Sequence, residues 1–125
     1  MGLSWKEKQA KNLSVEYIAA FLLSNANYLN GNENPPSFTN KADDEENITI
    51  LLKEINQRIS RDSSLNDHPY LKPILAAIKG NDTGDAQVIA IALKDVQLPE
   101  AVEKIMSAPG RVLADAPQRK TRLSL

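Results

Sequence analysis

Residues 14–29 read SVEYIAAFLLSNANYL, and this stretch decides the fold class. Its apolar side chains recur at steps of three and four residues, which places them on one stripe of an α-helix. The stripe consists of Val15, Ile18, Leu22, Ala26 and Leu29. Asn30 and Gly31 then predict the end of the helix, because both tolerate a left-handed backbone. Upstream, residues 4–7 (SWKE) have the pattern of a capping box. We therefore expect one long helix or two abutting helices over residues 4–29.

A second helix is predicted after a loop at residues 30–42, where two prolines and four asparagines disfavour regular structure. The helix begins near four consecutive acidic residues, 43–46, which suit the positive end of the helix dipole, and it ends near Arg58 and Arg61, which suit the negative end. Its apolar face comprises Ile48, Leu51, Leu52, Ile55 and Ile59. A polar connection over residues 62–69 follows.

The remaining chain predicts shorter helices. One should begin at about Pro73 and stop at Gly80, and another should open at Pro99 and end within residues 108–110. Between them, the apolar run over residues 86–93 fits a buried strand by period alone, but its three alanines and the following Lys-Asp favour a helix.

These elements predict an all-α fold, a compact bundle of five or six helices. We expect a single helical domain over residues 1–114, with Val112 and Leu113 docking back on the core. Residues 115–125, DAPQRKTRLSL, lack a helical stripe and predict a flexible polar and basic tail.

Composition narrows the function classes. The chain has 125 residues with 15 Lys plus Arg, 16 Asp plus Glu and no cysteine. This charge balance disfavours nucleic acid as a partner, and the lack of cysteine excludes disulfides, thiol catalysis and cysteine zinc sites. The longest mostly apolar run, residues 17–23, is too short for membrane insertion. No glycine motif for nucleotides is present, so we expect no cofactor. We expect a cytoplasmic location.

The tripeptide Asp82-Thr83-Gly84 carries the catalytic carboxylate in aspartic proteases. That chemistry needs two such carboxylates on loops between β-strands, sharing a proton. Here the tripeptide occurs once, in a chain that reads as helical. We therefore interpret Asp82 or Thr83 as the cap of the following helix, with Asp85 complementing its N-terminal partial charge.

His68 is the only histidine, so any histidine acid–base chemistry must use it. No nucleophile motif accompanies it, and Asp67-His68 reads as a solvated turn. The acidic residues 43–46 could suggest a metal site, but adjacent acids on a helix point in different directions. We predict neither a catalytic nor a metal-binding residue.

A well-patterned helical domain without a catalytic constellation predicts a non-enzymatic protein-binding module. Tyr28, Phe38 and Tyr70 lie in loops or near helix ends, where aromatic side chains often anchor interfaces. They are our candidate partner-binding residues, although each could instead cover an end of the core. Two alternatives remain open: a structural helical homo-oligomer such as a dimer, and a small hydrolase using Asp82 or His68.

The small, asparagine-rich, cysteine-free helical chain with a polar tail resembles the effector proteins that intracellular bacteria such as Legionella deliver into host cells. Within that group it is similar to the small helical inhibitors of ubiquitin deamidases and transglutaminases. The resemblance implies an inhibitor that occludes the active site of a partner enzyme and has no chemistry of its own. It carries no motif, so it assigns no functional residue.

Overall fold

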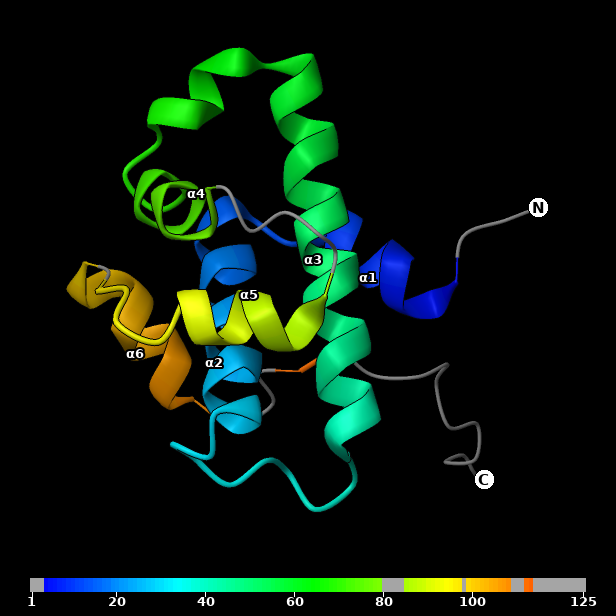
Figure 1. Ribbon diagram of the computed structural model, residues 1–125. Helices are drawn as coiled ribbons and strands as arrows, with labels where there is room; N and C mark the ends of the chain where they lie inside the picture. The colour runs from blue at the N-terminus through cyan, green and yellow to red at the C-terminus, as the bar shows by residue number, and fades with distance from the viewer. Residues whose placement is uncertain (1–3, 80–84, 98, 109–111, 114–125) are drawn as a thin grey trace.

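The computed structural model describes residues 4–79, 85–97, 99–108 and 112–113 of the chain. Within these ranges the chain forms six α-helices and one short 3-10 helix, η1, with no strand (Figure 1). Their bounds are α1 Trp5–Asn12, α2 Val15–Leu29, α3 Lys41–Arg61, η1 Ser63–Asp67, α4 Lys72–Ile78, α5 Ala86–Ala92 and α6 Glu100–Ser107. The prediction of an all-α bundle is confirmed. The tail predicted for residues 115–125, with the boundary at residue 114, lies outside the described residues.

The N-terminal region forms two helices, the second of the two arrangements that the sequence left open. The predicted capping box is present: Ser4 Oγ accepts from the Glu7 amide at 3.2 Å, and Glu7 Oε1 accepts from the Ser4 amide at 3.0 Å. The chain leaves α1 at Leu13 and enters α2 at Ser14, and both residues have an extended backbone. Extended dihedrals at two consecutive residues interrupt the helical hydrogen bonds, so α1 can turn away and pack on α3.

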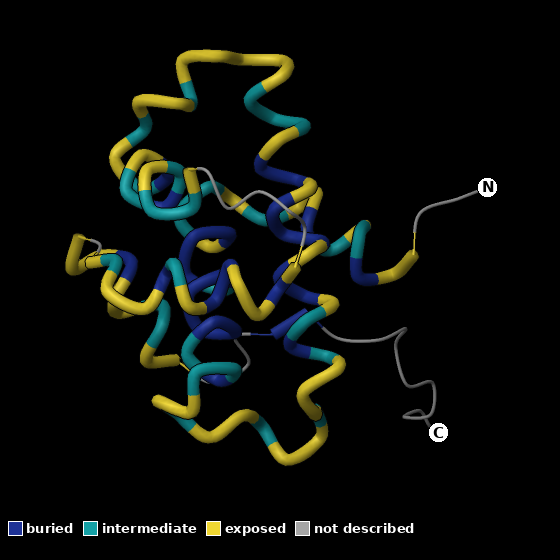
Figure 2. Tube along the Cα trace, viewed as in Figure 1, coloured by how far each residue is buried: buried dark blue, intermediate teal, exposed yellow. Residues whose placement is uncertain are grey.

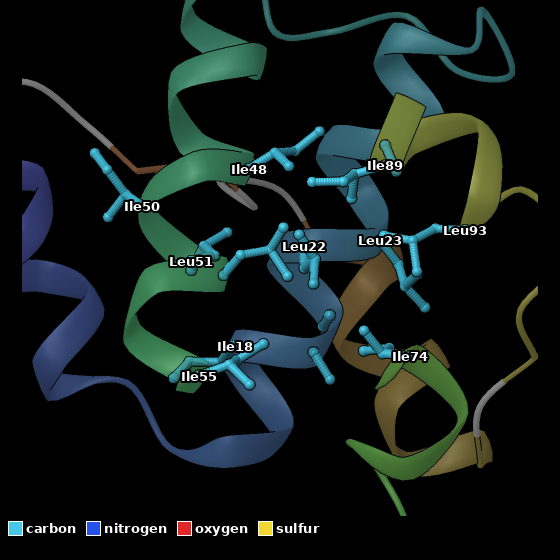
Figure 3. Close-up of a cluster of buried hydrophobic side chains, with 14 of the residues drawn as sticks. Ile18, Leu22, Leu23, Ile48, Ile50, Leu51, Ile55, Ile74, Ile89 and Leu93 are labelled. Atoms are coloured by element: carbon cyan, nitrogen blue, oxygen red, sulfur yellow. The ribbon is translucent and has the colours of Figure 1, made fainter. Parts of the chain in front are cut away.

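The helices α2 and α3 lie antiparallel, side by side, and form the centre of the molecule (Figure 1). Buried residues concentrate along α2 and along the side of α3 that faces it (Figure 2). In the close-up, Ile18 and Leu22 of α2 face Leu51 and Ile55 of α3 (Figure 3). All four are at most 1% exposed, as the periodicity of both segments predicts.

A polar contact crosses this apolar interface. Asn47 Nδ2 donates to Asn25 Oδ1 at 3.2 Å, and Asn25 Nδ2 donates to the Phe21 carbonyl at 2.7 Å. Both asparagines are fully buried. The two amides can bond to each other in one register only, so the contact aligns α2 against α3 along their length. Asn47 Oδ1 has no hydrogen-bond partner among the described residues.

The start of α3 is set locally, two residues before the predicted position. Asn40 is its N-cap: its side chain accepts from the Asp43 amide at 3.0 Å, and the Asp43 carboxylate accepts from the Asn40 amide at 3.0 Å. The helix ends at Arg61, as its basic last turn predicts. The connection after it is more regular than the sequence suggests, since Asp62 caps η1 through the Ser64 amide.

The last three helices complete the bundle: α5 and α6 pack against α2, and α4 packs against η1 and α5. α4 has Pro73 in its first turn, α5 crosses α2 and α3, and α6 packs on α2 (Figure 1). The apolar run at residues 86–93 is helical over Ala86–Ala92, and Asp85 caps it by accepting from the Gln87 and Val88 amides. The prediction that Asp82 or Thr83 caps this helix is wrong, because the helix begins after Asp85. Asp82, Thr83 and the predicted stop at Gly80 lie outside the described residues.

Residues 112–113 return to the core as predicted. Val112 is 6% exposed and Leu113 is 2% exposed, and Leu113 belongs to the central apolar cluster. None of the described helices combines the length and the apolar composition needed to cross a lipid bilayer.

Candidate binding groove

The three aromatic residues proposed from the sequence do not lie together. Tyr28 is 7% exposed and packs in the core, whereas Phe38 is 69% exposed in the loop before α3. Tyr70 follows η1 and is half-buried against the His68 ring, with centroids 5.2 Å apart. The loop of Phe38 directly precedes α3, whereas the turn of Tyr70 lies between η1 and α4 (Figure 1). Tyr28 thus covers the end of the core, the alternative that the sequence left open, and Phe38 is the member with the most accessible surface.

Of the two residues considered for catalysis, His68 is described by the structure and has a structural contact. His68 Nδ1 accepts from the Tyr70 amide at 3.1 Å, which engages one ring nitrogen in the turn that leads to α4. Asp82, the other candidate for the hydrolase alternative, lies outside the described residues. In the described part of the chain, no three His, Asp or Glu side chains gather closely enough to hold a metal ion.

Ion pairs with buried members join α1 to α3. Lys6 is 4% exposed, and its Nζ lies 2.8 Å from Glu46 Oε1 and 3.5 Å from Asp43 Oδ1. Farther along, Glu54 is 4% exposed and accepts from Lys11 at 3.1 Å and from Arg58 Nε at 2.7 Å. Burial by itself raises the pKa of Glu54, but the bonds from Arg58 and Lys11 outweigh it and hold that pKa below its ordinary value.

Asp44 is the exception in this interface. It is 2% exposed, and its Oδ1 has no hydrogen-bond partner among the described residues. Burial, reinforced by the neighbouring charges of Asp43 and Glu45, raises the pKa of Asp44 from 3.8 to about 6. The folded state therefore binds this proton more tightly than the unfolded state, so the contribution of Asp44 to stability falls as the pH rises toward 6.

Asp44→Asn is expected to raise the free energy of unfolding at pH 7.5 by about 1 kcal/mol, because it removes a buried charge at the cost of a favourable helix-dipole interaction. The gain should shrink as the pH falls through 6 and be absent near pH 4. Urea titrations of both proteins between pH 4 and pH 8 measure the difference. A gain that is the same at every pH would show that the ionisation of Asp44 is not its cause.

A groove lies between α3, α4 and α5, and two of its α3 residues, Lys53 and Gln57, also contact α1 at its edge. It has a volume of about 600 Å³, within the range of ligand pockets. Its floor is apolar and comes from all three helices: Leu52, Leu75, Ile78 and Ile89. Its polar lining residues are Thr49, Asn56, Gln57, Ser60, Lys53 and Lys79.

The α3 wall of the groove is one continuous helical stripe. Its members are spaced at three- and four-residue steps from Thr49 to Ser60. These two residues are eleven positions apart, which is about 16 Å of helix at about 1.5 Å per residue. The groove is therefore about three helical turns long, with short polar side chains along one edge.

Among the described residues that line the groove, the charged ones have one sign. They are Lys53 and Lys79, and none of these lining residues carries a carboxylate. Lys53 Nζ also lies 3.2 Å from Glu7 Oε2 at the edge of α1, and 58% of the Lys53 side chain is exposed. Lys79 is exposed and forms no ion pair with another described residue.

Two other hollows are less suited to an apolar ligand. One, of about 490 Å³ between α2, the turn after α5 and α6, includes Glu33, Lys94 and Glu103, so charges of both signs line it. A smaller one of about 270 Å³ lies beside Ile91, which is 64% exposed on α5. The remaining exposed large apolar residues, including Trp5, Tyr17 and Phe38, are scattered over different elements, as on most protein surfaces.

Sequence reasoning missed the groove because its walls come from three helices that are separate in the chain. One signal was present: the α3 stripe from Thr49 to Ser60 holds short polar residues beside Leu52, which predicts a partly covered face. No protein-family model matches the chain, and no curated protein or solved structure is detectably similar to it.

Proposed function

We propose that this protein is a non-enzymatic binding module that regulates or inhibits a partner enzyme, and that the α3–α4–α5 groove is its contact surface. The observation that carries the proposal is the groove itself. Leu52, Leu75 and Ile78 line an open hollow in which three helices meet, while Trp5, Tyr17 and Phe38 are exposed on separate elements. An apolar floor with a polar rim is the usual composition of a protein interface.

The resemblance to small helical inhibitors supports the choice of an enzyme as the partner. Ubiquitin-modifying effectors are the first candidates for assay. An inhibitor of this kind acts by occupying a surface that the substrate needs, so it requires a well-formed face and no reacting group of its own.

The test blocks the groove without disturbing the core. Asn56 is exposed on α3 and lines the groove, so Asn56→Trp should fill it and abolish capture of the partner from lysates of the source cell and of a host cell. The matched control is Asn12→Trp, at an exposed position at the end of α1 outside the groove, which should retain capture. Activity of a captured enzyme is then measured with and without the protein.

Capture that survives Asn56→Trp would show that the groove is not the contact surface. If no partner is captured and the chain sediments as a stable oligomer, the structural homo-oligomer is the better description. A partner whose activity is unchanged by stoichiometric protein would support an adaptor in place of an inhibitor.

A further inference from the structure

The groove also indicates the chemistry of its occupant. We propose that it binds an amphipathic α-helix whose apolar stripe is flanked by carboxylates, an inference that rests on the proposed function and specifies its partner.

The shape of the groove favours a helix over an extended peptide. An extended segment is usually recognised by adding to the free edge of a sheet, and no strand is present in the described part of this chain. A helix docks instead by placing side chains at i, i+3, i+4 and i+7 into a groove. The α3 wall runs for about three turns and offers side chains at matching intervals, from Thr49 through Asn56 to Ser60.

The apolar floor determines which side of the partner helix faces the groove. Leu52 and Ile89 are buried beneath the groove, and Leu75 and Ile78 of α4 are partly exposed along it. Leucine, isoleucine or methionine on the inward stripe of a partner would cover these side chains and exclude water from them.

The two lysines of the groove determine which charge is favourable beside the apolar stripe of the partner helix. Lys53 belongs to the α3 wall and Lys79 follows the end of α4, so the two come from opposite walls of the groove. Glutamate or aspartate on one flank of the docked stripe would meet the Lys79 ammonium. On the other flank it would meet the exposed Lys53 ammonium, which also pairs with Glu7. A basic helix would place like charges together, which discriminates against it.

The same argument disfavours the protein's own C-terminal segment as the occupant. Residues 115–125 contain Arg119, Lys120 and Arg122 against the single acidic Asp115. That segment has the same sign of charge as the groove.

The experiment uses two fluorescein-labelled peptides of about 15 residues with an identical leucine stripe, one flanked by glutamates and one by lysines. Fluorescence anisotropy is measured against the full chain at low and high salt. The glutamate-flanked peptide is expected to bind about tenfold more tightly, with a preference that weakens as salt is added. The double variant K53E/K79E should reverse the preference.

The control double variant is K8E/K94E, which makes the same charge change at exposed lysines outside this groove and should keep the preference for the acidic peptide. Circular dichroism of each variant confirms that the helices are intact.

Equal binding of the two peptides, or a preference that K53E/K79E leaves unchanged, would overturn the inference. If neither peptide binds at ~100 µM while Asn56→Trp still abolishes partner capture, the acidic-helix inference fails and the proposed function stands. If capture is also insensitive to Asn56→Trp, both fail. A dimer that Asn56→Trp dissociates would identify a second copy as the occupant and would also overturn the inference.

Discussion

Arg58→Ala is expected to lower the free energy of unfolding by about 3 kcal/mol, because it removes one partner of a buried ion pair together with the cap of a neighbouring helix. Arg58 Nη2 lies 3.1 Å from the Ala10 carbonyl oxygen, 3.1 Å from that of Lys11 and 2.7 Å from that of Leu13. These carbonyls belong to the end of α1, where the helix has no further amides to offer.

The second part of the loss comes from Glu54. Without Arg58 this buried carboxylate keeps Lys11 as its close cationic partner, while Arg61 lies 4.0 Å away. Arg58→Lys should recover only part of the stability, because an ammonium group cannot reach Glu54 and the α1 carbonyls together as the planar guanidinium does.

Arg61→Ala is the matched control for Arg58→Ala. The Arg61 side chain is 67% exposed and lies at the limit of an ion pair with the same Glu54 oxygen. Its removal should change the free energy of unfolding by less than about 0.5 kcal/mol. Urea denaturation at pH 7 measures all three variants. Equal losses for Arg58→Ala and Arg61→Ala would show that general charge, and not the α1 cap, accounts for the effect.

Leu22→Ala is expected to lower the free energy of unfolding by about 3–4 kcal/mol, which includes lost apolar burial and the cost of the cavity that remains. Leu22 is 0% exposed and lies in the centre of the core, between Ile18 and the facing side of α3 (Figure 3). The surrounding helices are held at several other contacts, so they cannot collapse fully into the vacated space.

The control for Leu22→Ala is Ile91→Ala. Ile91 is 64% exposed on α5, so its truncation should change the free energy of unfolding by less than about 0.5 kcal/mol. Thermal and urea unfolding followed by circular dichroism compare the two variants. A loss below about 1 kcal/mol for Leu22→Ala would indicate that the α2–α3 interface is loosely packed and would contradict the core described here.

Much of the fold could be predicted because its signals act within a few residues of one another. The capping box at Ser4, the apolar stripes of α2 and α3, the proline in the first turn of α4 and the proline directly before α6 all mark their helices correctly. The errors have local causes as well. Asn40 caps α3 through its bond with Asp43, so the helix begins two residues before the predicted position. Asp85 caps α5 in place of Asp82 or Thr83 because it lies directly before the first helical residue.

Much less of the candidate site could be predicted from the sequence. Tyr28 and Phe38 are both aromatic residues near helix ends, yet Tyr28 is buried and Phe38 is exposed. Aromatic character alone cannot separate the two environments, because exposure depends on which helix packs over each position. The groove was not predicted, since Leu52, Ile78 and Ile89 meet only after three separate helices have packed.

The sequence by itself determined the helical class of this protein, the approximate positions of its α-helices and the apolar faces of α2 and α3. Those properties follow from side-chain spacing and from caps that act within one turn. Only the tertiary structure decided that Lys6, Asp44 and Glu54 are buried, and that Lys53 and Lys79 share a groove. Burial and convergence depend on contacts between residues far apart in the chain, and such contacts leave no regular spacing in the sequence.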